Sequence, residues 1–223
     1  MASTITGRNA RQEGIVPFHS LSQCRATVIG VGAVGRQVAL QLAAMGAPWL
    51  QLVDPDTVEE VNLGCQAYLE ADVGRTKVEA TGHIVRQLSP DTELTEVRAR
   101  FRRSLYCGNA VFCCVDSIHT RKLIWESVHR RVEFFCDGRM SAEVLRVLTA
   151  SDPETRETYA GSLFPPAEAH SGACTARSTI FCANIAAGMM LSQFSKWLRR
   201  LPVDPDICLN LLSMELVLGC VAS

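Results

Sequence analysis

The chain has 223 residues, 48% of them apolar, and its formal net charge is −1. This suffices for one α/β domain with a sizeable core, or at most two small ones. The near-neutral charge argues against a partner held by a global field, such as nucleic acid or an anionic membrane. No run reaches the ~18 uninterrupted apolar residues of a membrane span, and residues 1–12 lack a secretory signal. We therefore expect a cytoplasmic protein.

Strands and helices are predicted to alternate along most of the chain. Residues 1–24 are polar and basic, and we expect an arm or short helix there. Strands are predicted at residues 26–30, 49–53, 93–99, 110–115, 132–136 and 143–150, and helices at 32–45, 77–88 and 119–129. This order indicates an α/β, Rossmann-like, mostly parallel doubly wound sheet with helices on both faces.

The C-terminal third departs from this alternation. Residues 151–173 are rich in Pro, Gly, Ser and acidic groups, and we expect a long crossover loop there. A helix at 179–201 and a closing antiparallel strand at 208–218 are predicted to follow. We expect residues 1–223 to form a single domain.

None of the ten cysteines belongs to a C-x-x-C pair. We therefore expect no four-thiolate zinc site. Several cysteines lie in apolar runs, such as residues 111–115 and 134–136, where a free cysteine behaves as a small hydrophobe. In a reducing compartment we expect most of them to fill the core.

A glycine-rich turn follows the first predicted strand and precedes the first predicted helix. Gly30, Gly32 and Gly35 form G-x-G-x-x-G, which permits a tight turn and presents helix N–H groups to phosphate. Asp54 ends the second strand, where it could bond ribose hydroxyls. These features suit both NAD and ATP enzymes. A glycine-rich turn without a ligand is the alternative.

Three further motifs carry a family resemblance. Residues 54–66 (DPDTVEEVNLGCQ) and 73–77 (VGRTK) are similar to the D-x-D-x-V-x-x-x-N-L-x-R-Q and V-G-x-x-K patterns of the ThiF/MoeB and ubiquitin-activating-enzyme family. Residues 113–117 (CCVDS) with Arg121 match its C-x-D-[NS] and following Arg. Residues 8–12 (RNARQ) resemble its N-terminal R-x-x-R-Q.

The resemblance implies ATP-dependent adenylation of the C-terminal glycine carboxylate of a ubiquitin-like or sulfur-carrier protein. It implies Mg²⁺ as cofactor, a homodimer and, in a conjugation pathway, a conjugating enzyme as further partner. The implied roles place Asp54 on the ribose, Asn62 and Lys77 over the nucleotide phosphates, and Asp116 on Mg²⁺. Gln66 is a further cofactor-binding residue, and Arg11 would reach the phosphates of the neighbouring subunit.

These residue types suit the reaction. Adenylation gathers negative charge on phosphate oxygens, which Lys, Arg and Mg²⁺ stabilise. Asp116 follows an apolar strand, where open α/β sheets place ligand groups. The alternatives are a solvated lysine at a helix start for Lys77 and a helix N-cap for Asp116.

One position departs from the family pattern. Cys65 stands where the family has the arginine of N-L-x-R-Q, and a thiol cannot stabilise phosphate charge as a guanidinium does. Arg75, two positions before Lys77, or an arginine from a partner could compensate.

Cys174 is the candidate thiol for an acyl or sulfur adduct. It lies in the segment HSGACTARST at residues 170–179, at a place where several family members carry an acceptor cysteine. Arg177 and a following helix N-terminus could lower its pKa, so that its thiolate attacks the adenylate. His170 is a candidate base. An ordinary loop cysteine and a surface histidine are the alternatives.

Three other functions stay open. An NAD(P)-dependent oxidoreductase would use the same glycine-rich turn, although Asn62, Lys77 and Asp116 have no role in hydride transfer. A nucleotide-binding pseudoenzyme scaffold is supported by Cys65. A small-molecule or tRNA dehydratase of the same superfamily is the third.

Overall fold

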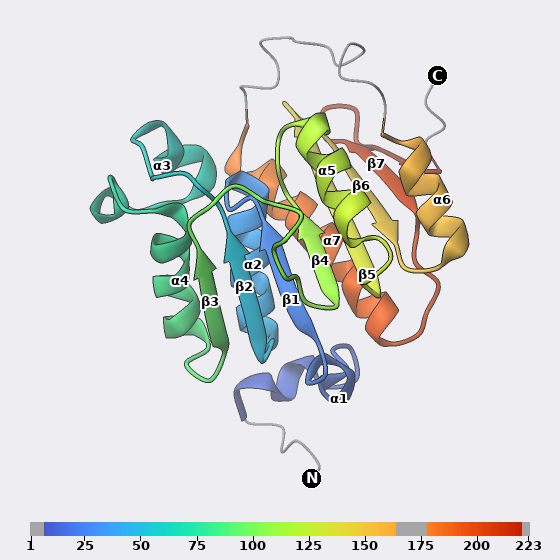
Figure 1. The fold of residues 1–223 in the computed structure, drawn as a ribbon, viewed down its shortest axis with the longest axis horizontal. Helices are drawn as coiled ribbons and strands as arrows, with labels where there is room; N and C mark the ends of the chain where they lie inside the picture. Colours follow the sequence, from blue (N-terminus) through green and yellow to red (C-terminus); the bar gives the residue numbers. More distant parts are fainter. Residues whose placement is uncertain (1–6, 164–177, 220–223) are drawn as a thin grey trace.

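The structure, a computed structural model, describes residues 7–163 and 178–219 (Figure 1). Its strands form one eight-stranded sheet in the order β3-β2-β1-β4-β5-β6-β7-β8. The strands are β1 (Arg25–Ile29), β2 (Trp49–Val53), β3 (Glu93–Val97), β4 (Ala110–Cys113), β5 (Phe134–Ser141), β6 (Val144–Ala150), β7 (Asp206–Asn210) and β8 (Glu215–Leu218). The first five pair in parallel and the last three join antiparallel. The predicted Rossmann-like, mostly parallel sheet is confirmed.

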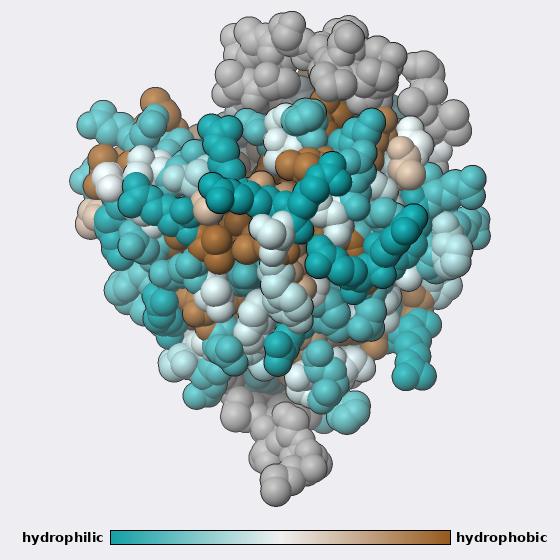
Figure 2. Space-filling view, viewed as in Figure 1, coloured by the Kyte–Doolittle hydropathy of each residue, from teal (hydrophilic) through white to brown (hydrophobic). Residues whose placement is uncertain are grey.

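Helices cover both faces of this sheet, as predicted. One apolar cluster joins it to α2 (Ala33–Met45), α4 (Lys77–Leu88) and α7 (Ile180–Leu198). A second cluster joins its other face to α5 (Ile118–Val128) and α6 (Pro153–Gly161). Parallel strands buried on both faces are typical of this layering. Hydrophilic side chains cover most of the face that carries α5 (Figure 2).

The carboxyl ends of the parallel strands meet at one edge, the upper edge in Figure 1. β1 lies between β2 and β4, so the connections leave it in opposite directions. Such a switch point is where open α/β sheets bind ligands. The glycine-rich turn after β1 lies there.

The expectation of a loop over residues 151–173 is wrong at its start, where α6 forms. Asp152 caps this helix, because its Oδ1 accepts a hydrogen bond from the backbone N–H of Thr155 at 2.9 Å. Pro153 occupies the first helical position, where its missing N–H costs nothing. Residues 164–177, with His170, Cys174 and Arg177, lie outside the described residues.

Two smaller differences concern short elements. The predicted closing strand is a hairpin of β7 and β8. The helix α3 (Val61–Gln66) and the 3-10 helix η2 (Glu70–Asp72) were not predicted, since neither is long enough to show a helical apolar period. The basic N-terminus forms η1 (Gly7–Gln12) and α1 (Phe18–Leu21).

Four cysteines fill the core as expected. Cys24, Cys113, Cys136 and Cys182 are buried, and burial raises the pKa of the Cys136 thiol to about 12. Within residues 7–163 and 178–219, no helix is long and apolar enough to cross a membrane.

Candidate functional site

Two glycines of the turn are required by its internal packing. Gly30 has a φ of +86°, and a Cβ there would lie 2.7 Å from the carbonyl oxygen of Cys114. A Cβ on Gly35 would collide with the carbonyl oxygen of Gly30. The turn therefore holds its shape only with glycine at both positions.

Gly32 differs, because open space lies beside it. A Cβ built on Gly32 would meet only Oε1 of Gln66, at 3.9 Å. That oxygen is buried and has no hydrogen-bond partner in the described residues. Gly32 is also the N-cap of α2, so the first N–H groups of this helix point into the same region. The N–H groups suit an anionic ligand that approaches the backbone closely, whereas the Gln66 oxygen suits a donor group of a ligand.

Asp54 shapes this turn. Its Oδ2 accepts a hydrogen bond from the N–H of Val31 at 2.6 Å, and its Oδ1 accepts one from the N–H of Asp56 at 2.8 Å. Burial raises the pKa of Asp54, although both hydrogen bonds oppose that shift. The carboxylate thus ties the turn after β1 to the segment that follows β2. Its role on a ribose stays a prediction.

A polar cleft of about 540 Å³ opens at the carboxyl ends of β2 and β3. Its lining includes the predicted residues Asn62 and Lys77 and adds Asp56 and Arg98. The remaining lining residues are Pro55, Thr57 and Glu59. The cleft therefore joins two cations, two carboxylates and an amide with few apolar groups, which fits a polar ligand.

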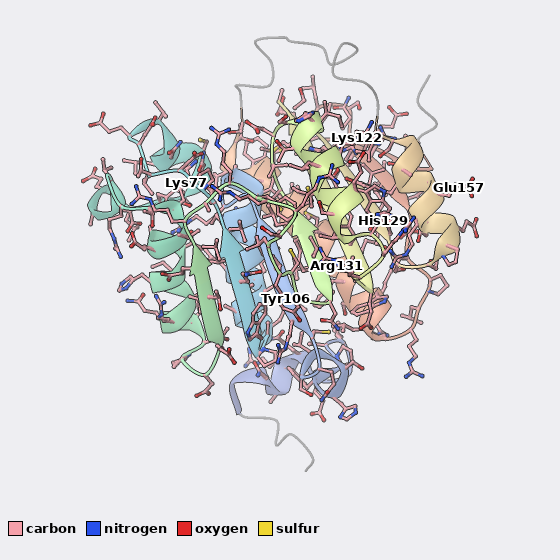
Figure 3. The ribbon with its side chains drawn as sticks, in the orientation of Figure 1. Lys77, Tyr106, Lys122, His129, Arg131 and Glu157 are labelled. Carbon is pink, nitrogen blue, oxygen red and sulfur yellow. The ribbon has the colours of Figure 1, made fainter. Side chains whose placement is uncertain are left out.

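Lys77 is held at the first position of α4, at the upper edge of the sheet in Figure 3. The backbone N–H of Glu79 donates to Oγ1 of Thr76 at 3.3 Å, which caps the helix. The Lys77 ammonium lies 3.2 Å from Oδ2 of Asp56, and its side chain is only 9% exposed. Lys77 is therefore not the solvated lysine of the alternative interpretation.

Asn62 lies in α3 and is buried. Its Oδ1 accepts a hydrogen bond from the N–H of Glu59 at 3.0 Å. The side-chain oxygen is thus engaged within the chain, which leaves the amide nitrogen as the group suited to donate to a ligand.

Asp116 is exposed and follows β4, as predicted. It is not the N-cap of α5, since Ser117 has that place and its Oγ accepts from the N–H of Thr120 at 3.4 Å. Arg121, which also matches the family pattern, points inward. It pairs with buried Asp137 and donates to the carbonyl oxygen of Gly138 at 3.2 Å.

Arg11 lies in η1, at the end of the molecule opposite the glycine-rich turn (Figure 1). Nε2 of the adjacent Gln12 donates to the carbonyl oxygen of Ala44, near the C-terminus of α2, at 3.0 Å. The 13 residues of α2 span about 20 Å. Arg11 is therefore remote from its own turn, and its contact with the phosphates of a neighbouring subunit stays a prediction.

The arginine missing at Cys65 is not replaced by Arg75. Arg75 pairs with Asp72 at 3.2 Å and does not line the cleft, whereas Arg98 does. The Sγ of Cys65 donates to the carbonyl oxygen of Val61 at 3.3 Å.

Sequence reasoning missed Arg98, Tyr68 and Arg36 at this site. Arg98 directly follows β3, so the rule that singled out Asp116 could have found it. Tyr68 donates to the carbonyl oxygen of Val31 at 2.6 Å across 37 positions of sequence. Arg36 packs on Tyr68. No local pattern signals either contact.

The sequence pattern of the ThiF family matches residues 8–217. The SAMP-activating enzyme E1 of Haloferax volcanii is 39% identical over 85 residues, which cover 38% of this chain and 32% of that protein. The molybdopterin-synthase adenylyltransferase of Salmonella typhimurium is 33% identical over 108 residues, or 46% of this chain and 43% of that protein. The matches therefore span less than half the length of these curated relatives.

Solved structures share the fold. The crystal structure of E. coli MccB with MccA-N7isoASN has a TM-score of 0.73 and covers 90% of this chain and 65% of that chain, at 15% identity. The structure of PaaA has a TM-score of 0.72 with 18% identity, over 90% of this chain and 64% of that chain.

Proposed function

The chain belongs to the ThiF family, and from that premise we propose that it adenylates the C-terminal glycine carboxylate of a ubiquitin-like or sulfur-carrier protein with ATP. The observation that carries the proposal is the open backbone at Gly32, beside the buried and unpartnered Oε1 of Gln66. A relative from E. coli, 32% identical over 103 residues, is named sulfur carrier protein ThiS adenylyltransferase, which supports a carrier protein as substrate.

In the proposed reaction the carrier carboxylate attacks the α-phosphorus of ATP, and pyrophosphate leaves. The N–H groups at the start of α2 would bind phosphate oxygens. Lys77 is held in the cleft with Asp56 as its ion-pair partner, so its ammonium would offset the charge that builds on those oxygens. Asn62 would donate from its amide nitrogen, and Asp54 would keep the turn in shape while bonding the ribose.

Mg²⁺ would be held by Asp116 together with the phosphates. Among the described residues, no group of three or more His, Cys, Asp and Glu side chains could hold a metal by itself. One exposed carboxylate fits Mg²⁺, which usually takes one or two protein carboxylates and completes its shell with phosphate and water. When bound, it would withdraw charge from the phosphates.

Arg98 is proposed to contribute the cleft guanidinium that position 65 lacks, because it shares the cleft with Lys77. Arg11 is proposed to act across a homodimer, since its own turn lies about one helix length away. After adenylation, the Cys174 thiolate would attack the acyl carbon, forming a thioester and releasing AMP, and its proton would pass to solvent. A reducing cytoplasm would keep that thiol available, and a conjugating enzyme could accept the product.

The test is ATP–pyrophosphate exchange in the presence of candidate carriers that end in glycine. We expect exchange with a matching carrier, and about a 10²–10³-fold loss in Lys77→Ala and Asp116→Ala. Arg86→Ala is the matched control, because it removes a charge from the exposed side of α4, where Arg86 pairs with Glu96 at 2.8 Å. Nicotinamide binding without ATP binding would favour an oxidoreductase. ATP and carrier binding without exchange would favour a scaffold.

The thioester is tested separately on a gel without reductant. Mixing the full chain with ATP and its carrier should give an adduct that thiols remove and that Cys174→Ala lacks. An adduct that persists in Cys174→Ala would assign the acceptor thiol elsewhere.

A further inference from the structure

We infer that Arg36 is a positioning residue of the nucleotide site. Its buried guanidinium is linked to the glycine-rich turn through Thr81 and Tyr68, and it supplies positive charge that Cys65 cannot. The inference rests on the proposed function, because it concerns how the phosphates of ATP are held. It adds a residue that none of the motifs above contains.

Arg36 lies one helical turn after Gly32, and its N–H donates to the carbonyl oxygen of Gly32 at 2.9 Å. Only 2% of the residue is exposed. The carbon at the centre of its guanidinium lies 4.2 Å from the centre of the Tyr68 ring, and Nη1 donates to Oγ1 of Thr81 at 3.0 Å. Its Nε is buried without a hydrogen-bond partner in the described residues.

No ion pair joins Arg36 to a carboxylate within residues 7–163 and 178–219. The acid that acts on it through space, Asp72, is paired with Arg75. Burial lowers the pKa of Arg36, but arginine keeps its proton in proteins. A buried cation without a paired anion is costly, and the cost falls when an anion binds nearby, where the low dielectric strengthens their attraction.

A chain of hydrogen bonds links this cation to the turn. Arg36 donates to Thr81, the Thr81 hydroxyl lies 3.2 Å from Oη of Tyr68, and Tyr68 donates to the carbonyl oxygen of Val31 at 2.6 Å. The proton count is consistent when Thr81 donates to Tyr68, because each hydroxyl then gives one proton. Val31 lies between Gly30 and Gly32, so the chain ends inside the phosphate-binding turn.

The same chain also holds α4. Thr81 lies one turn after Lys77 on α4, and Oη of Tyr68 lies 3.5 Å from the carbonyl oxygen of Lys77. Arg36 and Tyr68 therefore join the turn that would bind phosphate to the helix whose lysine would neutralise it. If Arg36 acts through its charge, its substitution should weaken the binding of ATP more than that of adenosine. If it only holds the turn and α4 in place, both affinities should fall equally.

The experiment measures binding of ATP, AMP and adenosine to the full chain by calorimetry. Arg36→Gln removes the charge but keeps an amide donor for Thr81, and Arg36→Lys keeps the charge. We expect Arg36→Gln to weaken ATP binding by about tenfold, AMP binding less, and adenosine binding hardly at all. Arg36→Lys should restore most of the difference between ATP and adenosine. Arg86→Gln, on the exposed side of α4, should leave all three affinities unchanged.

Equal losses for all three ligands in Arg36→Gln, or no loss, would overturn the inference while leaving the proposed function intact. A wild-type chain that binds no adenine nucleotide would overturn both. If Arg36→Gln does not fold, Tyr68→Phe provides the second test. This substitution keeps the aromatic face over the guanidinium and removes the hydrogen bond to Val31. The affinity for ATP should therefore fall more than the affinity for adenosine. Wild-type affinity for both ligands would count against the inference.

Discussion

Two buried arginines on opposite faces of the sheet have different partners. Arg121 is 5% exposed and pairs with Asp137, which also accepts from Nε of Arg139 at 2.9 Å and from Oη of Tyr159 at 3.0 Å. Arg36 is 2% exposed and has a ring and a hydroxyl, without a carboxylate in ion-pair contact in the described residues. The first cation has a buried carboxylate as its partner, shared with Arg139, whereas the second has none among the described residues.

This contrast teaches that burial alone does not assign a role. The cluster around Asp137 ties β5 to α6, because Arg139 also donates to the carbonyl oxygen of Ser162 at 3.1 Å. Its groups are committed to one another and to backbone. Around the turn, by contrast, Oε1 of Gln66 and Nε of Arg36 have neither a hydrogen bond nor an ion pair within residues 7–163 and 178–219. Polar groups left buried and unpaired cost stability, which makes them the stronger pointer to a ligand.

The largest expected effect is on the buried cluster around Asp137. Asp137→Ala would leave Arg121 and Arg139 without their shared carboxylate, so the free energy of unfolding should fall by about 3–5 kcal/mol. Urea denaturation measures it. Arg103→Ala is the control, since Arg103 pairs with Glu126 and their side chains are 63% and 43% exposed, and its loss should stay below about 1 kcal/mol. Similar losses in both variants would contradict the distinction.

The second prediction compares alanine substitutions at two glycines of the glycine-rich turn. Gly35→Ala would drive a methyl group into the carbonyl of Gly30, and overpacking of this kind costs roughly 1–3 kcal/mol. Gly32→Ala has room for its methyl group and should change the free energy of unfolding by less than about 1 kcal/mol, while weakening ATP binding. Denaturation and calorimetry on both variants measure these effects. Unchanged ATP affinity in Gly32→Ala would show that the open space there is not the nucleotide site.

Much of the glycine-rich turn and its surroundings could be predicted from sequence, because the sequence patterns that indicate them are local. Gly30, Gly32 and Gly35 span the end of a strand and the start of a helix that each show a clear apolar pattern. The end of α4 at Leu88 is likewise predicted correctly, because Ser89 and Pro90 follow its apolar period. Such features depend on neighbours within one or two turns of chain.

The remainder could not be predicted because it depends on long-range contacts. The hydroxyl of Tyr68 meets Val31 only after β1, α2 and β2 have packed. Arg121 matches a family motif, yet whether it faces the ligand or the interior is set by Asp137, 16 positions later. The helix α6 is a different case, since Pro153 after Asp152 is a local start signal that the composition of the segment obscured.

The third prediction tests the link between the turn and α4. Tyr68→Phe removes the donor to the Val31 carbonyl, and an unpaired buried acceptor costs about 1–3 kcal/mol. Urea denaturation should show that loss. Tyr106→Phe is the control, because Tyr106 is 61% exposed and lies well below Lys77 of the cleft in Figure 3. A stability equal to the wild type in Tyr68→Phe would mean that the 2.6 Å contact contributes nothing.

The smallest expected effect concerns an exposed ion pair on the same helix as Arg121. Glu126 of α5 lies 3.0 Å from Arg103, and their side chains are 43% and 63% exposed. Glu126→Gln should lower the free energy of unfolding by about 0.2–1 kcal/mol, and added salt should reduce that difference because exposed charges are screened. Denaturation at low and high salt measures both. Helix α5 thus carries two ion-pairing residues, Arg121 and Glu126, which differ mainly in burial. If Glu126→Gln cost as much stability as Asp137→Ala and salt did not change that cost, position on the helix and not desolvation would govern these ion pairs.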